Sequence, residues 1–199
     1  RGDFESAHAH YQSALKLAKE SNHKIFMADA LCRLGTLGIE QGNYQNARTC
    51  LEEAESLYAA LGDQHSRAKY LINLATVLTY LGDLQQAHAL NLEALELLRI
   101  MGDKHGMGIA LLNLGMDAGV TEKQQDSNVF YQESLQIFRV LGDKRMMSHL
   151  LNNLGGNFQK LGEFEKAKQH LEESLSIQKQ IGDVSLIAHA LYILGQVQH

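Results

Sequence analysis

The feature that most constrains this chain is a turn motif that returns every 40 residues. Gly-Asp occurs at positions 62–63, 102–103, 142–143 and 182–183, with no slip in the spacing. A second series lies midway between these turns, at Gly2-Asp3, Gly42-Asn43, Gly82-Asp83 and Gly162-Glu163, and its missing member is Glu122-Lys123. A turn therefore recurs every 20 residues, and the segments between turns alternate between two types.

Each turn combines a residue that can end one helix with a residue that can begin the next. Glycine follows the last apolar residue of a segment, as after Leu61 and Met101, and can adopt the left-handed conformation that ends helices. The Asp or Asn beside it can cap the helix that follows. The chain has no proline, which suits a helical chain because proline inside a helix costs about 3 kcal/mol. The pattern predicts ten helices, near residues 4–20, 24–41, 44–61, 64–81, 84–101, 104–121, 125–141, 144–161, 164–181 and 184–198.

The two segment types carry different apolar patterns. We call the first type A. It has leucine at 31, 71, 111, 151 and 191, and a second leucine three residues after each of these. The next residue is small, with glycine at 35, 115, 155 and 195 and alanine at 75. Spacings of three and four place the leucines on one helix face. The second type, B, opens with a large apolar residue at 4, 44, 84 and 164, has alanine three residues later, and a small residue seven beyond that.

This pattern of Leu-x2-Leu-Gly followed by Gly-Asp-aromatic-x2-Ala resembles the tetratricopeptide repeat. The usual repeat is about 34 residues long, and the 40-residue form resembles the repeats of cell-polarity adaptors, kinesin light chains and bacterial signalling regulators. The resemblance implies an all-α fold, a right-handed α-solenoid of antiparallel helical hairpins. Two departures are the absence of the family's proline and the turn at 120–127, where Ser127 replaces the small Ala. We expect that turn to be the most irregular, with Gly119 ending its helix early.

The repeats divide the chain into one array over residues 1–199. It consists of a half-repeat at 1–21, full repeats at 24–61, 64–101, 104–141 and 144–181, and a half-repeat at 184–199. Complete arrays usually carry a polar capping helix, so we expect the chain to be a fragment of a longer protein. Apolar faces at the two ends would then favour a homodimer or end-to-end association.

The bulk properties bear on which classes of partner are expected. A net charge of -5 does not favour a nucleic-acid surface, which would need a strongly basic face. No apolar run approaches the roughly 18 residues of a membrane span, and the chain shows no basic-then-apolar leader. Two cysteines, Cys32 and Cys50, form neither a metal spacing nor a disulfide framework. We therefore expect a cytoplasmic protein that acts without nucleic acid or membrane.

Nothing in the sequence supports catalysis, a metal or a cofactor. His149 and His189 occupy equivalent positions on successive A segments, but two histidines without a third ligand make a poor zinc site. Neither cysteine has a companion base at a recognisable spacing. Met107, Met146 and Met147 could form a soft binding patch, although core filling is the stronger interpretation.

The binding site is expected on the A helices, which line the concave side of such arrays. Position 6 of the A segment reads Arg33, Asn73, Asn113 and Asn153, and an amide can both donate to and accept from an extended peptide backbone. The resemblance implies the same use, because the family holds peptides with Asn and Arg at this place. The alternative is that these amides bond between neighbouring repeats. The predicted peptide-binding residues are Arg33, Lys69, Asn73, Thr76, Tyr80, Ile109, Asn113, Met116, His149, Asn153 and Lys160.

Two functions fit these observations. The first is a non-catalytic scaffold that binds a protein or peptide segment in its groove, where cations slightly favour a carboxylate-bearing partner and Ile109, Met116 and Val120 offer an apolar floor. The second is an effector-sensing module of a bacterial signalling or transcription regulator, in which a peptide or small metabolite occupies the groove.

Overall fold

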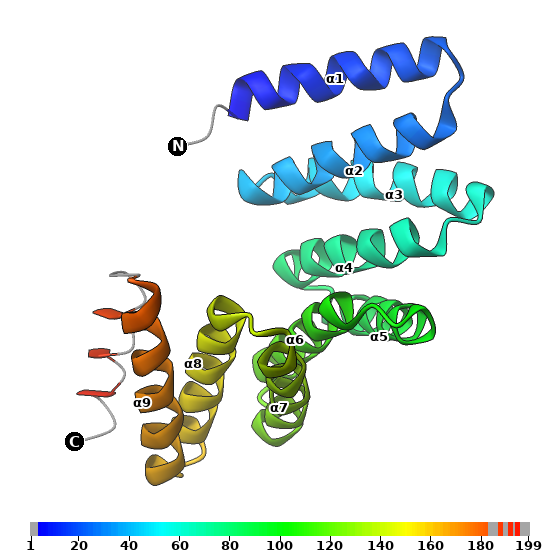
Figure 1. The fold of residues 1–199 in the computed structure, drawn as a ribbon. Helices are drawn as coiled ribbons and strands as arrows, with labels where there is room; N and C mark the ends of the chain where they lie inside the picture. The colour runs from blue at the N-terminus through cyan, green and yellow to red at the C-terminus, as the bar shows by residue number, and fades with distance from the viewer. Residues whose placement is uncertain (1–3, 183–186, 189–190, 193, 196–199) are drawn as a thin grey trace. The chain divides into compact units, whose positions relative to one another are not determined.

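The computed structural model describes residues 4–182 together with 187, 188, 191, 192, 194 and 195, and over these residues the fold is entirely helical (Figure 1). The helices are α1 (Phe4–Glu20), α2 (Lys24–Glu40), α3 (Tyr44–Leu61), α4 (Gln64–Leu81), α5 (Leu84–Met101), α6 (Lys104–Val120), α7 (Gln124–Leu141), α8 (Lys144–Lys160) and α9 (Phe164–Ile181). The predicted boundaries agree within one residue for these nine helices. The predicted tenth helix, 184–198, lies largely outside the described residues.

Both halves of the turn motif behave as the sequence predicts. Asp63 accepts a hydrogen bond from the Ser66 backbone N–H at 3.1 Å, and Asp103 accepts one from Gly106 at 2.9 Å. Asn43, Asp83 and Asp143 cap α3, α5 and α8 in the same way. The glycines of the motif take positive φ, for example 69° at Gly62 and 87° at Gly82. The motif therefore ends one helix and begins the next with two adjacent residues.

The expectation of an irregular turn at 120–127 is wrong. Gly119 lies within α6, which continues to Val120, and α7 begins at Gln124. Glu122 takes the left-handed conformation itself, with φ 58°, as Asn22 does at 54° in the first turn. A non-glycine residue can adopt this conformation at a modest cost, so the turn keeps the same length without its glycine.

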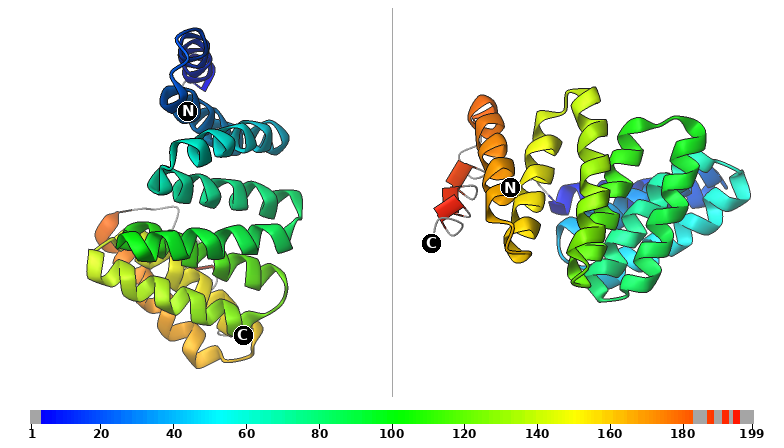
Figure 2. Two further views of the ribbon diagram at one scale, coloured as in Figure 1. Left: turned by 90° about the vertical axis from the view of Figure 1, so that its right-hand side faces the viewer. Right: turned by 90° about the horizontal axis from the view of Figure 1, so that it is seen from below.

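The chain forms two compact units, Arg1–Gly102 and Asp103–His199, which we call unit 1 and unit 2. Unit 1 contains α1 to α5 and unit 2 contains α6 to α9. Within each unit, consecutive helices pack side by side as antiparallel neighbours; the tightest pairs are α2 with α3 and α4 with α5 in unit 1, and α6 with α7 and α8 with α9 in unit 2 (Figure 2). Each of these pairs is an A helix followed by its B helix.

Glycine in the A helix sets how closely its B helix approaches. A Cβ added at Gly35 would lie 2.6 Å from Leu51 Cγ, and one at Gly155 would lie 2.6 Å from Leu171 Cγ. The paired leucines of three A segments are all buried: Leu71, Leu74, Leu111, Leu114, Leu151 and Leu154. The A-segment pattern of two leucines and a small residue therefore forms the contact inside each hairpin.

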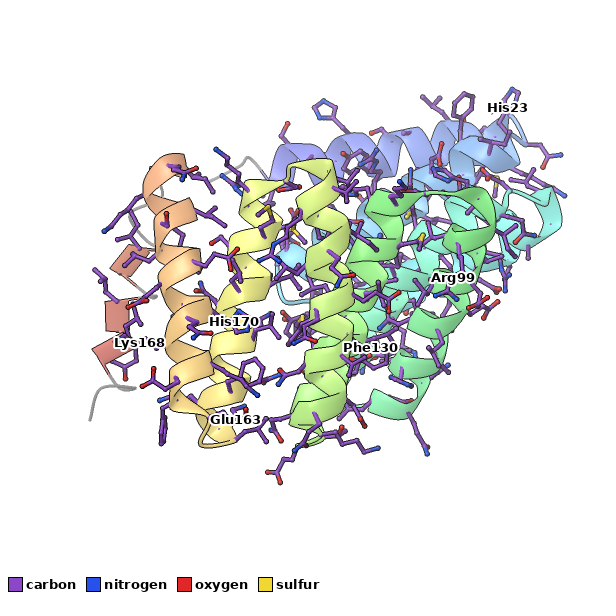
Figure 3. The ribbon with its side chains drawn as sticks, turned by 60° about the horizontal axis from the view of Figure 1, so that its bottom comes forward. His23, Arg99, Phe130, Glu163, Lys168 and His170 are labelled. Atoms are coloured by element: carbon purple, nitrogen blue, oxygen red, sulfur yellow. The ribbon has the colours of Figure 1, made fainter. Side chains whose placement is uncertain are left out.

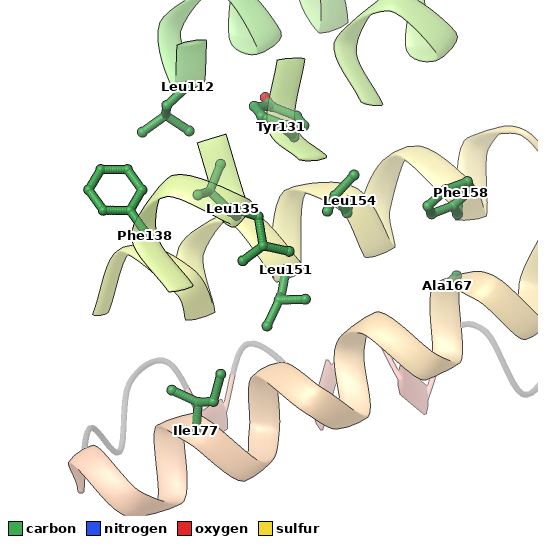
Figure 4. Close-up of a cluster of buried hydrophobic side chains, with 10 residues drawn as sticks. Leu112, Tyr131, Leu135, Phe138, Leu151, Leu154, Phe158, Ala167 and Ile177 are labelled. Carbon is green, nitrogen blue, oxygen red and sulfur yellow. The ribbon is translucent and has the colours of Figure 1, made fainter. Parts of the chain in front are cut away.

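The core of unit 2 is formed by α6 to α9 (Figure 4). Its buried side chains include Phe138, Leu151 and Leu154, and Met146 and Met147 pack against its margin. Of the three methionines expected to fill the core, Met146 and Met147 are partly buried against this cluster, and Met107 is partly buried outside it.

Unit 2 also buries polar side chains that the repeat pattern does not predict. Ser127 is fully buried, and its hydroxyl donates to the Gly115 carbonyl at 2.6 Å. The Asn157 amide donates to Ser127 Oγ at 2.8 Å and to Asn128 Oδ1 at 3.0 Å. Ser127 therefore supplies a hydrogen bond where the other repeats place an alanine.

Candidate binding surface

In unit 1, the predicted site residues lie on two neighbouring A helices, α2 and α4. The Asn73 amide on α4 donates to Thr36 Oγ1 on α2 at 3.3 Å and lies 3.9 Å from Cys32 Sγ. Thr36 in turn donates to the Cys32 carbonyl at 3.0 Å. The alternative role for the amides, bonding between repeats, thus applies to the amide nitrogen of Asn73. Its carboxamide oxygen accepts no hydrogen bond from the residues that the structure describes.

Two cations stand on the same surface of unit 1. Arg33 on α2 and Lys69 on α4 are both exposed, and neither forms an ion pair or hydrogen bond with any described residue. Both lie close enough to Cys32 to influence its thiol. Burial is the main cause that raises the pKa of Cys32, while the Asn73 hydrogen bond and the charges of Arg33 and Lys69 act in the opposite direction.

Asp29, an acidic residue on α2, already has a partner. The Tyr58 hydroxyl on α3 donates to Asp29 Oδ1 on α2 at 2.9 Å. Burial, and then this hydrogen bond, raise the pKa of Tyr58, so the phenol stays protonated and continues to donate at neutral pH. This contact holds the Asp29 carboxylate toward α3, and Asp29 forms no ion pair with Arg33.

An aromatic pair lies at the end of α4. Tyr80 stacks on Tyr44 of α3 with ring centroids 4.5 Å apart and an interplanar angle of 9°. Tyr80 keeps 58% of its surface exposed, while Thr76, one turn earlier, donates to the Ile72 carbonyl at 2.9 Å. Helical periodicity predicts Tyr80 at the site but does not point to Tyr44, whose place at the start of the preceding B helix is the signal that could have found it.

In unit 2, the predicted site residues lie on α6 and α8. Ile109 packs partly buried against the core, so the expected apolar floor is reduced to Met116 and Val120, which are 37% and 60% exposed. Asn113 is half-buried and already has an interaction within the chain.

The remaining unit 2 candidates all lie on α8. Asn153 is half-buried and forms no hydrogen bond with the residues that the structure describes, and Lys160 is exposed. His149 is exposed, but partial burial of its imidazole among neighbouring groups lowers the pKa of the ring. Its predicted neighbour His189 lies outside the described residues.

A second aromatic contact in unit 2 joins α8 and α9. His170, labelled in Figure 3, stacks on Phe158 with centroids 5.3 Å apart, and Lys166 Nζ lies 5.4 Å from the Phe158 ring. Burial is the main cause that lowers the pKa of His170. The neutral imidazole of His170 therefore packs against the Phe158 ring. Among the described residues, no group of three His, Cys, Asp or Glu side chains is placed so that it could hold a metal ion.

Unit 1 also has an open pocket of about 260 Å³ between α1 and α2. Its lining comes from Phe4, Ala7 and Tyr11 on α1 and from Arg33, Thr36, Leu37 and Glu40 on α2.

None of the helices in the described part of the chain is long and apolar enough to span a membrane.

These features define an all-helical repeat protein whose A helices present amides, cations and aromatic rings. The tetratricopeptide repeat family model matches residues 26–100 and 107–180, and the chain belongs to that family. No curated protein matches the chain significantly by sequence.

Solved structures share the fold at low sequence identity. BtubC from P. vanneervenii superposes with a TM-score of 0.84 at 18% identity, covering 99% of this chain and 84% of that one. A signal-transduction ATPase with a tetratricopeptide repeat sensor, from Pyrococcus horikoshii, gives 0.79 at 21% identity over 92% of this chain and 29% of its own. A Rap protein complexed with competence and sporulation factor gives 0.81 at 15%, over 98% of this chain and 60% of its own. The chain thus spans less than two thirds of the last two proteins.

Proposed function

We propose that the chain is a non-catalytic scaffold that binds an extended, acidic protein segment along the A helices of unit 1. The observation that carries the proposal is the pair of exposed cations Arg33 and Lys69, which have no partner among the described residues and stand beside Asn73. Cations in this situation can bind carboxylates without first breaking an internal ion pair. Each such exposed contact contributes about 0.2–1 kcal/mol, so several contacts are needed for a specific complex.

Asn73 can supply the contact to the partner's backbone. Its nitrogen donates to Thr36 at 3.3 Å, which fixes the orientation of the amide. Its oxygen can then accept a backbone N–H from an extended segment, at about 0.5–1.5 kcal/mol net for such a bond. The Tyr44–Tyr80 stack adds an apolar edge suited to an aromatic or aliphatic side chain of the partner.

Unit 2 offers a second set of similar groups on its own A helices. Asn153 and Lys160 on α8 and the exposed Met116 on α6 combine an amide, a cation and an apolar side chain. We assign this set the same kind of partner, because the residue types repeat those of unit 1. The Rap protein with the same fold was solved with competence and sporulation factor bound, which supports a binding role for such arrays.

The test is a selection of random peptides displayed on phage, using the immobilised chain as bait. We expect the selected sequences to be enriched in Asp and Glu, and the enrichment to be lost with the double variant Arg33→Glu, Lys69→Glu. The matched control is Lys16→Glu, Lys24→Glu, which changes the charge equally; Lys24 lies nine residues from Arg33, on the opposite side of α2. Equal enrichment with both double variants, or no acidic preference, would contradict the proposal.

A further inference from the structure

The asparagines at position 6 of the A segment have different surroundings in the two units. In unit 1, the Asn73 amide donates to Thr36 on the preceding A helix at 3.3 Å. Two 40-residue periods later, Asn153 is the equivalent amide, and Met116 holds the position of Thr36. A thioether is only a weak acceptor, and Asn153 forms no hydrogen bond with the described residues. Both the nitrogen and the oxygen of this half-buried amide can therefore bond a ligand.

The glycine three residues after Asn153 has no packing role among the described residues. Gly155 is needed in α8 because an added Cβ would lie 2.6 Å from Leu171 Cγ, whereas a Cβ added at Gly156 would meet nothing within 4 Å. Glycine is the poorest helix former after proline, so Gly156 weakens α8 although no described contact requires it. The helix therefore bears a cost that keeps one point of its surface open.

Groups suited to a peptide residue stand around this open point. Asn153, Gly156 and Lys160 follow one another at spacings of three and four, so they share one face of α8. Met116 holds the same place on α6 as Gly156 holds on α8, and 37% of its surface is exposed. Both helices contribute side chains to the buried cluster of unit 2 (Figure 4). The two A helices of unit 2 thus combine an amide, a cation and an adaptable apolar side chain with an open point.

We propose that the open point beside Gly156 receives a large aliphatic or aromatic side chain of the bound segment, which packs on Met116. This inference rests on the proposed function and names the residue class that unit 2 selects. Asn153 bonds the backbone of the same peptide residue, because an amide can donate and accept together. Packing on Met116 removes apolar surface from water, whereas a polar side chain there would lose hydration without a partner. Lys160, exposed and without an ion pair among the described residues, favours Asp or Glu beside the apolar residue.

The first test repeats the phage selection with Gly156→Leu, which fills the open point. The matched control is Gln136→Leu, which introduces the same side chain at an exposed site on α7. We expect the unaltered chain and the control to select peptides enriched in large apolar residues next to Asp or Glu. Gly156→Leu should lose the apolar enrichment and keep the acidic enrichment that Arg33 and Lys69 provide. Melting curves by circular dichroism confirm that each variant is folded.

The second test pairs changes in the protein with changes in one selected peptide, titrated by fluorescence anisotropy. Each large apolar residue of the peptide is changed in turn to alanine. With the unaltered chain, one of these changes should weaken binding by about tenfold to a hundredfold, as expected for loss of a buried aliphatic or aromatic side chain. With Gly156→Leu, the same change should have little effect. Gly156→Ala should raise the melting temperature and still weaken binding of the parent peptide, a combination that a role in folding alone cannot produce.

The outcomes separate this inference from the proposed function. Apolar enrichment that persists with Gly156→Leu, or equal losses for the alanine peptides with both proteins, would overturn the inference and leave the acidic scaffold in place. Apolar enrichment without an acidic preference would contradict the proposed function alone, and no enrichment of either kind would overturn both. Self-association of the unaltered chain in sedimentation velocity, abolished by Gly156→Leu, would also overturn the inference, because a second copy would then occupy the open point.

Discussion

The Asn73 amide on α4 donates a hydrogen bond to the Thr36 hydroxyl on α2 at 3.3 Å, linking two consecutive A helices of unit 1. One end of the amide thus belongs to the scaffold, while its oxygen accepts nothing from the described residues. A position that repeats along the chain can therefore serve packing and binding at once. Separating these two roles requires that stability and affinity be measured together.

Two adjacent glycines on α8 should respond in opposite ways to alanine. Gly155→Ala places a Cβ 2.6 Å from Leu171 Cγ, so the hairpin must shift, at a cost of about 1–3 kcal/mol. At Gly156 an added Cβ meets nothing within 4 Å, and alanine should stabilise the helix by up to about 1 kcal/mol. Urea unfolding of both variants checks this, and equal effects at the two sites would show that Gly155 does not set the helix spacing.

The hydrogen bond between Asn157 and Ser127 should appear as an energetic coupling. Ser127→Ala removes the acceptor for Asn157 Nδ2 and the donor to the Gly115 carbonyl, and we expect a loss of about 1–3 kcal/mol. Asn157→Leu, which matches Leu37 three hairpins earlier, should also destabilise alone. The double variant should lose less than the sum of the two, with a coupling of about 0.5–3 kcal/mol. Strict additivity in urea unfolding would contradict the network.

Much of this fold follows from the sequence because its turn chemistry is local. Asp63 and Gly62 carry their capping and turn roles in their own side chain and backbone, so a 40-residue period was enough to locate nine helices. Glu122 was missed for the opposite reason. Its backbone is left-handed, and the turn contains no glycine or asparagine that would signal this conformation.

The site was less predictable than the fold. Helical periodicity placed Arg33, Lys69 and Tyr80 on an exposed face, and the structure agrees. Periodicity could not show that Ile109 leans into the core or that Tyr58 engages Asp29. Such contacts depend on how far each helix is rotated against its neighbour, which distant residues decide.

The cap of α4 should make stability depend on pH in the acid range. The hydrogen bonds from the Ser66 side chain, and then from its backbone, hold the pKa of Asp63 below its usual value. Because the folded pKa is lowered, the contribution is complete above the unfolded pKa of about 3.9 and is lost as pH falls through the folded value. Asp63→Asn should therefore flatten the pH dependence of the unfolding free energy below about pH 4.

The control for this experiment is Asp126→Asn in the first turn of α7. The Asp126 carboxylate makes no hydrogen bond with the described residues. Its loss should therefore change the pH dependence of the unfolding free energy in acid less than the loss of Asp63. The two variants are compared by urea unfolding at a series of pH values. A larger effect at Asp126 than at Asp63 would show that the capping bonds do not cause the loss of stability at acid pH.

The most direct test of the proposed site measures affinity and melting temperature on one protein, the variant Asn73→Ala. The probe is the best acidic peptide from the phage selection, titrated by fluorescence anisotropy. If the carboxamide oxygen of Asn73 accepts a backbone N–H of the peptide, loss of that bond costs about 0.5–1.5 kcal/mol. Affinity should then fall by about twofold to tenfold, since 1.4 kcal/mol corresponds to a factor of ten. Unchanged affinity with a lowered melting temperature would contradict the proposal, because Asn73 would then serve only to hold α2 and α4 together.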